Sequence, residues 1–94
     1  MKSGIERQRR KIDRLDRRVA NLLAKRFRQV VSIGRVKREN KIDVRDKTRE
    51  DEVLVRIDSV VDDGCARRFV RNVFRGIIEE SSRVQREDED WTEK

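Results

Sequence analysis

Apolar residues recur every seven positions along the first third of the chain, and this repeat constrains the fold more than any other feature. The two rows are Ile5, Ile12, Val19 and Ile33, and Leu15, Leu22 and Val36. Positions seven apart fall on one face of an α-helix. No proline interrupts them, because the chain contains none. The pattern predicts one helix from about Gly4 to about Glu39, roughly 50 Å long.

Polar residues break these rows where apolar side chains are expected. Arg26 occupies the first row and Gln29 the second, and Lys37 follows Val36 at the edge of the same face. A charge on a burying face is costly unless it meets a counter-charge. Taken singly, each cation is better explained by a stem that packs while its head reaches water. Taken together, they predict a face that binds an anion.

Two shorter helices are expected after a loop at 40–45. Asp46 suits the N-cap of the first, and Gly64 suits the left-handed position just after its end. The second starts near Ala66, and its buried side turns polar at Ser81 and Gln85. The two apolar stripes are Val53, Leu54, Ile57, Val60 and Val61, and then Phe69, Val70, Val73, Phe74, Ile77 and Ile78. The fold class is therefore all-α, with one long N-terminal helix and two shorter ones.

The chain contains few apolar residues for a domain that folds as a monomer. Of its 94 residues, 34% are hydrophobic and 48% are charged. Small domains bury a limited share of their surface, so we expect association that shares a core between subunits. We take residues 1–94 as a single domain, with 1–4 and 87–94 as frayed ends. The absence of proline, where about 5% is usual, leaves an engineered origin open beside a natural one.

Charge is distributed unevenly. Residues 1–38 contain 14 Lys/Arg and 3 Asp/Glu, a net +11, whereas residues 39–94 contain 12 and 16, a net −4. A basic half favours an anionic partner: nucleic acid, a membrane surface or a small polycarboxylate. No stretch approaches 18 apolar residues and no apolar leader is present, so no membrane span or signal peptide is expected. The lone Cys65 fits a reducing, cytoplasmic compartment, and the lack of histidine argues against a metal site.

Several short strings together resemble the all-helical (type II) class of chorismate mutases, over roughly residues 5 to 86. The strings are Arg9-x-x-Ile12-Asp13-x-Leu15-Asp16, Leu22-Leu23-Ala24-Lys25-Arg26, Ile33-Gly34-Arg35-Val36-Lys37, Val44-Arg45-Asp46-x-x-Arg49-Glu50 and Phe74-x-x-Ile77-Ile78-Glu79-x-Ser81-x-x-x-Gln85. Each string alone is weak, but their common order is a strong signal. The chain departs from the family in lacking loop prolines and in its Arg-rich outer faces.

The resemblance implies a cofactor-free isomerase that converts chorismate to prephenate in aromatic amino-acid biosynthesis. This rearrangement is unimolecular and requires no nucleophile, metal or proton transfer. By resemblance, Arg9 and Arg26 bind the substrate carboxylates. Lys37 and Gln85 donate to the ether oxygen on which negative charge grows. Since Gln85 is neutral at all relevant pH values, a flat pH profile near neutrality is expected.

The remaining site residues surround the substrate hydroxyl and the second carboxylate. By resemblance, Glu50 and the Asp46 backbone hold the hydroxyl, Ser81 touches a carboxylate, and Arg49 supports the site electrostatically. The expected catalytic residues are Lys37, Gln85, Arg26 and Glu50. Taken alone, Asp46 and Glu50 are equally explained as complements of a helix N-terminus. Taken alone, Ser81 is equally well explained as a site residue or as a polar residue where the helix emerges into solvent.

Arg9 and Lys37 cannot serve one site within one chain. They are 28 positions apart, roughly 42 Å along a single helix, which no ten-carbon metabolite spans. If Arg9 belongs to the site, a second chain supplies it. Antiparallel pairing of two long helices would bring it there, which predicts an intertwined two-fold homodimer with two equivalent pockets.

Three other functions stay open at this stage. An isochorismate-pyruvate lyase would share the fold and the cationic pocket. A basic helical module for nucleic acid would explain the +11 segment, although the chain lacks stacking aromatic residues and a reading motif. A structural coiled coil would leave the polar residues on three apolar faces unexplained. Trp91 is expected to be a tail residue without a site role, and Cys65 to be inert.

Overall fold

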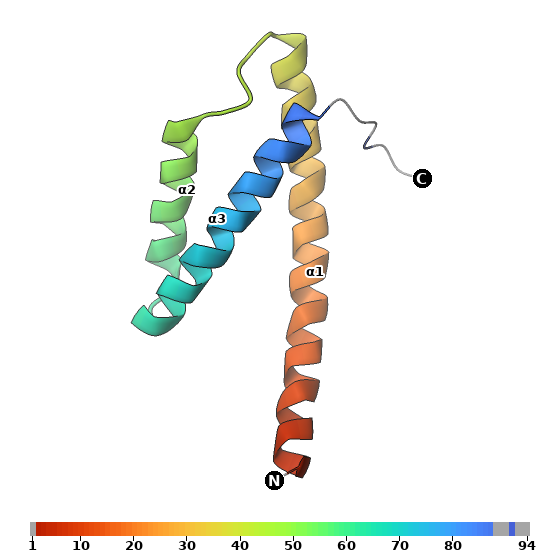
Figure 1. Ribbon diagram of the computed structural model, residues 1–94, viewed down its shortest axis with the longest axis vertical. Helices are drawn as coiled ribbons and strands as arrows, with labels where there is room; N and C mark the ends of the chain where they lie inside the picture. The colour runs from red at the N-terminus through yellow and green to blue at the C-terminus, as the bar shows by residue number, and fades with distance from the viewer. Residues whose placement is uncertain (1, 88–90, 92–94) are drawn as a thin grey trace.

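The chain forms three α-helices in the computed structural model, which describes residues 2–87 and Trp91 (Figure 1). They are α1 (Lys2–Glu39), α2 (Lys47–Val60) and α3 (Gly64–Arg86). The described residues contain no strand, so the predicted all-α class with one long and two shorter helices is confirmed. Of the ends expected to fray, residues 2–4 belong to α1 and Glu87 is the C-cap of α3. Residues 1, 88–90 and 92–94 lie outside the described part.

Helix α3 lies between the other two and packs on both (Figure 1). It crosses the C-terminal half of α1 and runs on beside α2, whereas α1 and α2 do not pack on each other over the described residues. The N-terminal half of α1 projects away from α2 and α3 (Figure 1). Within residues 2–87, no helix is both long and apolar enough to cross a bilayer.

The buried core is small and lies where α3 crosses α1. It consists of Val30, Val31 and Val84, each no more than 8% exposed. Phe27 and Trp91 pack against it, with ring centroids 5.4 Å apart and ring planes at 82°. This edge-to-face contact is a favourable aromatic geometry. Trp91, predicted to be a tail residue, therefore packs beside the core.

The apolar rows of α1 have no cover in a single chain. All seven members of these rows are between 51% and 63% exposed: Ile5, Ile12, Leu15, Val19, Leu22, Ile33 and Val36. A fully buried side chain of this kind contributes about 1.5–3 kcal/mol. Burial of these exposed rows would therefore stabilise the fold more than burial of the three core valines does.

The C-terminal ends of α1 and α2 are capped in different ways. At the end of α1, Lys41 adopts a left-handed conformation (φ 55°) and Ile42 N–H donates to Lys37 O at 2.8 Å. This is the bonding of a Schellman motif. At the end of α2, Arg67 donates to the carbonyl oxygens of Val61 and Asp62 at 2.8 and 3.0 Å.

The predicted left-handed role of Gly64 is wrong. Gly64 is the first residue of α3 and has no positive φ, so α3 starts two positions before Ala66. Asp63 is the N-cap, and its carboxylate accepts from Cys65 N–H at 2.9 Å and from Ala66 N–H at 3.4 Å. Since Arg67 satisfies carbonyl groups after α2 and Asp63 satisfies the first amides of α3, no left-handed turn is needed.

Candidate active site

A cavity of about 160 Å³ is lined by residues of all three helices and of the loop before α2. Seven of the eight predicted site residues line it: Arg26, Lys37, Asp46, Arg49, Glu50, Ser81 and Gln85. Apolar side chains and one hydroxyl complete the wall: Val30, Ile33, Val44, Val53, Ile78 and Ser82. Side chains as far apart in sequence as positions 26 and 85 therefore share one cavity.

Lys37 and Gln85 form the most connected pair in this cavity. Lys37 Nζ donates to Val44 O at 2.8 Å and to Gln85 Oε1 at 3.3 Å, while Gln85 Nε2 donates to Val30 O at 2.9 Å. An ammonium group has three donors and a primary amide two. Each side chain thus keeps one donor without a partner among residues 2–87 and Trp91. Two fixed donors remain for a ligand that accepts hydrogen bonds.

Gly34 allows Gln85 to approach α1 this closely. It is buried on α1, and a Cβ atom at this position would lie 3.0 Å from Gln85 Cγ and 3.5 Å from Gln85 Cβ. Any larger residue would push against the Gln85 side chain, which lines the cavity. The role of Gly34 was not predicted from the sequence. The available signal was an isolated glycine inside a helical pattern, three positions before Lys37, because such glycines often mark close approach.

Arg26 and Ser81 form the second polar contact between α1 and α3. Arg26 Nη1 donates to Ser81 Oγ at 2.5 Å, and Ser81 Oγ donates to Ile77 O at 2.7 Å. Burial, followed by the nearby charge of Arg49, lowers the pKa of Arg26. Both effects disfavour an isolated cation, so an anion in the cavity would relieve them.

The positive charge of the cavity is only partly balanced. In the described part of the chain, neither Arg26 nor Lys37 has a carboxylate partner, and Arg49 pairs with exposed Glu52 at 3.7 Å. The carboxylate of Asp46 is used locally as the N-cap of α2, where it accepts from Arg49 N–H at 3.0 Å. The cavity therefore suits a small ligand with more than one negative charge.

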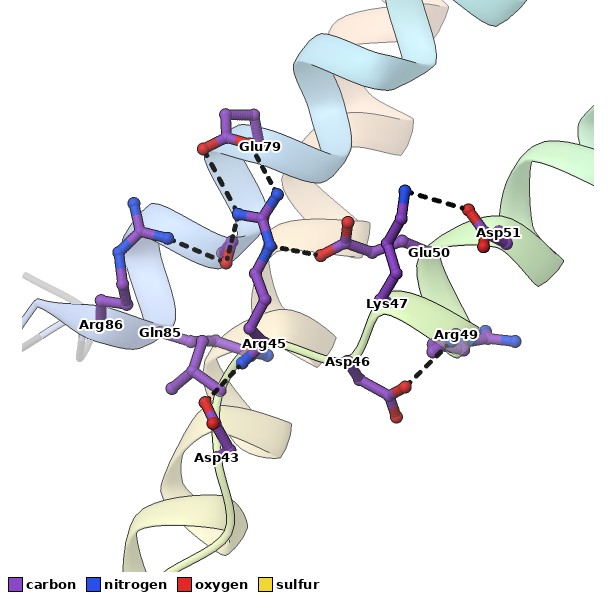
Figure 2. A network of polar contacts seen from close by, with 12 residues as sticks. Asp43, Arg45, Asp46, Lys47, Arg49, Glu50, Asp51, Glu79, Gln85 and Arg86 are labelled. Carbon is purple, nitrogen blue, oxygen red and sulfur yellow. Dashed lines mark hydrogen bonds and ion pairs between the residues drawn. The ribbon is translucent and has the colours of Figure 1, made fainter.

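Glu50 is a partly buried carboxylate of the cavity. Arg45, which does not line the cavity, forms an ion pair with it (Figure 2). Arg45 Nε lies 3.0 Å from Glu50 Oε2, and its two Nη atoms lie 3.4 and 3.2 Å from the carboxylate oxygens of Glu79 on α3. The hydrogen bond to Glu79 and the charges of Glu50 and Glu79 raise the pKa of Arg45. Arg45 was not predicted as a functional residue, because its sequence position gives no sign of these partners.

Arg9 is the one predicted site residue that lies outside this cavity. It is exposed on the N-terminal half of α1, 28 helical positions before Lys37. Gln29, the other polar residue in the predicted rows, is also exposed. Over the described residues, no group of three or more acidic or cysteine side chains is placed to hold a metal ion.

The sequence matches the family model of chorismate mutase type II over residues 8–86. Comparisons with curated proteins and with solved structures found no match. The matched range includes all eight predicted site residues, all of α2 and all of α3. Since this match covers most of the chain and the fold has the expected three helices, the chain belongs to the chorismate mutase type II family.

Proposed function

We propose that the chain catalyses the rearrangement of chorismate to prephenate, as a step of aromatic amino-acid biosynthesis. The observation that carries this proposal is the set of uncompensated donors from Arg26, Lys37 and Gln85 in one cavity. Chorismate is a dicarboxylate, and its rearrangement breaks one C–O bond while forming one C–C bond within the same molecule. The donors match both the charge of the substrate and the charge that develops as the bond breaks.

The cavity would contribute to the rate in two ways. Arg26, supported by Arg49, would bind a carboxylate and select the compact reactive conformer. The free donors of Lys37 and Gln85 would bind the ether oxygen as it becomes negative. A rate acceleration of ~10⁶ requires about 8 kcal/mol of differential stabilisation, and one well-placed donor contributes ~3–4 kcal/mol. Two such donors, together with selection of the reactive conformer, would supply a differential stabilisation of this size.

The substrate hydroxyl would lie at the N-terminal end of α2. Glu50 lines the cavity, and its Oε1 has no hydrogen-bond partner among residues 2–87 and Trp91. It would accept a hydrogen bond from the substrate hydroxyl, while the Asp46 backbone offers a second contact. This assignment gives Glu50 a binding role that does not require it to change protonation state.

We further propose that the active form is a two-fold homodimer in which Arg9 of one chain completes the site of the other. A groove of about 450 Å³ lies between α1 and α3, with a mostly apolar wall that includes Leu23, Phe27 and Val73. It adjoins the site through Arg26 and Ser81, which line both cavities. The uncovered apolar rows of α1 are the matching surface, since antiparallel pairing would bury them and carry Arg9 to the site. Location in the cytoplasm stays a prediction.

Mixing two inactive variants tests both proposals. Purified wild type should convert chorismate to prephenate, whereas Arg9→Ala and Lys37→Ala should each be nearly inactive. Co-expressed, they should regain roughly one quarter of the wild-type activity, because half of the dimers are mixed and each mixed dimer has one intact site. No recovery would reject the shared site, and full activity of Arg9→Ala would remove Arg9 from it. Turnover of isochorismate without turnover of chorismate would replace the mutase by a lyase.

A further inference from the structure

We propose that Arg45 is a positioning residue of this site, which holds the Glu50 carboxylate in the orientation that receives the substrate. The inference rests on the proposed function for its substrate and on the contacts of Arg45 for its mechanism. Arg45 does not line the cavity. It therefore acts on the reaction through another side chain rather than by touching the substrate.

The guanidinium group divides its donors between two helices. Its Nε atom faces Glu50 on α2 at 3.0 Å, and its Nη atoms face both oxygens of Glu79 on α3 (Figure 2). Nη1 also lies 3.4 Å from Ser82 Oγ. The fork on Glu79 fixes the plane of the guanidinium, and this plane then fixes where Glu50 Oε2 can lie.

The geometry leaves one oxygen of Glu50 for the substrate. The Glu50 side chain is 16% exposed, and Oε2 is bound to Arg45. If Arg45 were absent, the carboxylate would lie among Arg26, Lys37 and Arg49 without a fixed partner. It would then be free to turn and pair with one of these cations, which would remove both a hydroxyl acceptor and a substrate donor. Arg45 prevents this by compensating the charge of Glu50 without lining the cavity itself.

The backbone around Arg45 supports the same arrangement. Its N–H donates to Asp43 Oδ1 at 3.1 Å, and the residue before it, Val44, accepts from Lys37 Nζ through its carbonyl oxygen. The residue after it, Asp46, is the N-cap of α2. Three consecutive loop residues thus orient Lys37, Glu50 and the start of α2.

A second ion pair between the same two helices provides a matched control. Arg71 on α3 binds Asp58 on α2 through three contacts of 2.8–3.2 Å, with side-chain exposures of 35% and 32%. Neither residue lines the cavity. Arg71→Ala therefore removes the same charge and the same kind of link between α2 and α3 as Arg45→Ala does, without access to Glu50.

The experiment is a double-mutant cycle measured by steady-state turnover of chorismate. Arg45→Ala should lower kcat/KM about tenfold with a raised KM, since a hydrogen bond to a charged group contributes ~1.5 kcal/mol. In a Glu50→Ala background the same change should lower kcat/KM less than about twofold, because Arg45 then has no carboxylate of the site to orient. Arg71→Ala should leave KM unchanged.

Three results would overturn the proposal. Arg45→Ala and Arg71→Ala could lower kcat/KM equally, or the effects of Arg45→Ala and Glu50→Ala on kcat/KM could simply multiply in the double mutant. The third is an unchanged KM in Arg45→Ala. If circular dichroism shows that Arg45→Ala does not fold, Arg45→Lys replaces it under the same criteria, because a lysine keeps the charge but loses the fork. Wild type without turnover would reject the function itself. An active wild type with an unaffected Arg45→Ala would reject only the role of Arg45.

Discussion

Replacing Gly34 by alanine tests whether the close contact of α1 and α3 sets the position of Gln85. The added Cβ atom would lie 3.0 Å from Gln85 Cγ, where carbon atoms normally lie about 3.5–4.0 Å apart. Relief of this contact requires a displacement of roughly 0.5–1 Å. If Gln85 moves away from α1 by this amount, the Lys37–Gln85 contact, now 3.3 Å, exceeds hydrogen-bonding distance.

The expected effects on stability and on activity differ in size. Alanine is about 1 kcal/mol better than glycine inside a helix, whereas overpacking costs about 1–3 kcal/mol. The free energy of unfolding should therefore change by between zero and a loss of about 2 kcal/mol. Turnover is more sensitive, because misplacing a catalytic group by about 1 Å can cost ~10²-fold. We expect kcat to fall by about ten- to a hundredfold in a protein that remains folded.

Two controls isolate the contact. Gly64→Ala adds a methyl group on a helix where no atom lies within 4 Å, and it should leave kcat unchanged. Gln85→Ala removes Cγ and leaves Cβ at 3.5 Å from the new methyl group, an ordinary contact distance. Gly34→Ala should therefore cost no further activity in the Gln85→Ala background. Unchanged kcat in Gly34→Ala alone, or an equal loss in both backgrounds, would refute the reasoning.

Three further predictions concern catalysis, pH dependence and stability. Lys37→Ala removes a donor to Val44 O and to Gln85 and should lower kcat about 10²–10³-fold in the chorismate assay, with an unchanged circular dichroism spectrum. Wild type should show a flat rate between pH 6 and 8, while Gln85→Glu should gain activity as the pH falls, because only a protonated carboxyl donates to the ether oxygen; equal pH profiles would contradict this. The hydrogen bond from Arg71 lowers the pKa of Asp58, so the pair stabilises the fold above the unfolded-state pKa and this contribution is lost as the pH falls. Thermal unfolding should show Asp58→Asn below wild type at pH 7, and this gap should close below about pH 4, whereas a gap that persists in acid would exclude an ionic origin.

The sequence was most informative where local pattern decides structure. The seven-residue repeat predicted α1 to within two residues of its start, and the side chain of Asp46 predicted the N-cap of α2. Periodicity also placed Arg26 and Lys37 on one face, and both line the same cavity. These predictions depend on helix geometry alone, which a sequence expresses directly.

Contacts that depend on how helices cross could not be predicted in this way. Gly34 is important because α3 passes over it at Gln85, and the partners of Arg45 include Glu79, 34 positions away. The prediction that Gly64 ends α2 in a left-handed conformation was wrong for a related reason. A glycine after a helix is only one of several ways to satisfy the carbonyl groups at its end. Arg67, reaching back from the next helix, supplies another.

The central position of α3 also determines how much of the chain must be present before it can fold. Both helix pairs that pack in this structure include α3, and α3 follows α1 and α2 along the chain. A chain that ends before residue 64 has two helices with nothing in their own chain to pack on, so neither gains tertiary stabilisation within the protomer. A truncation before residue 64 would therefore leave two isolated helices for proteases to degrade.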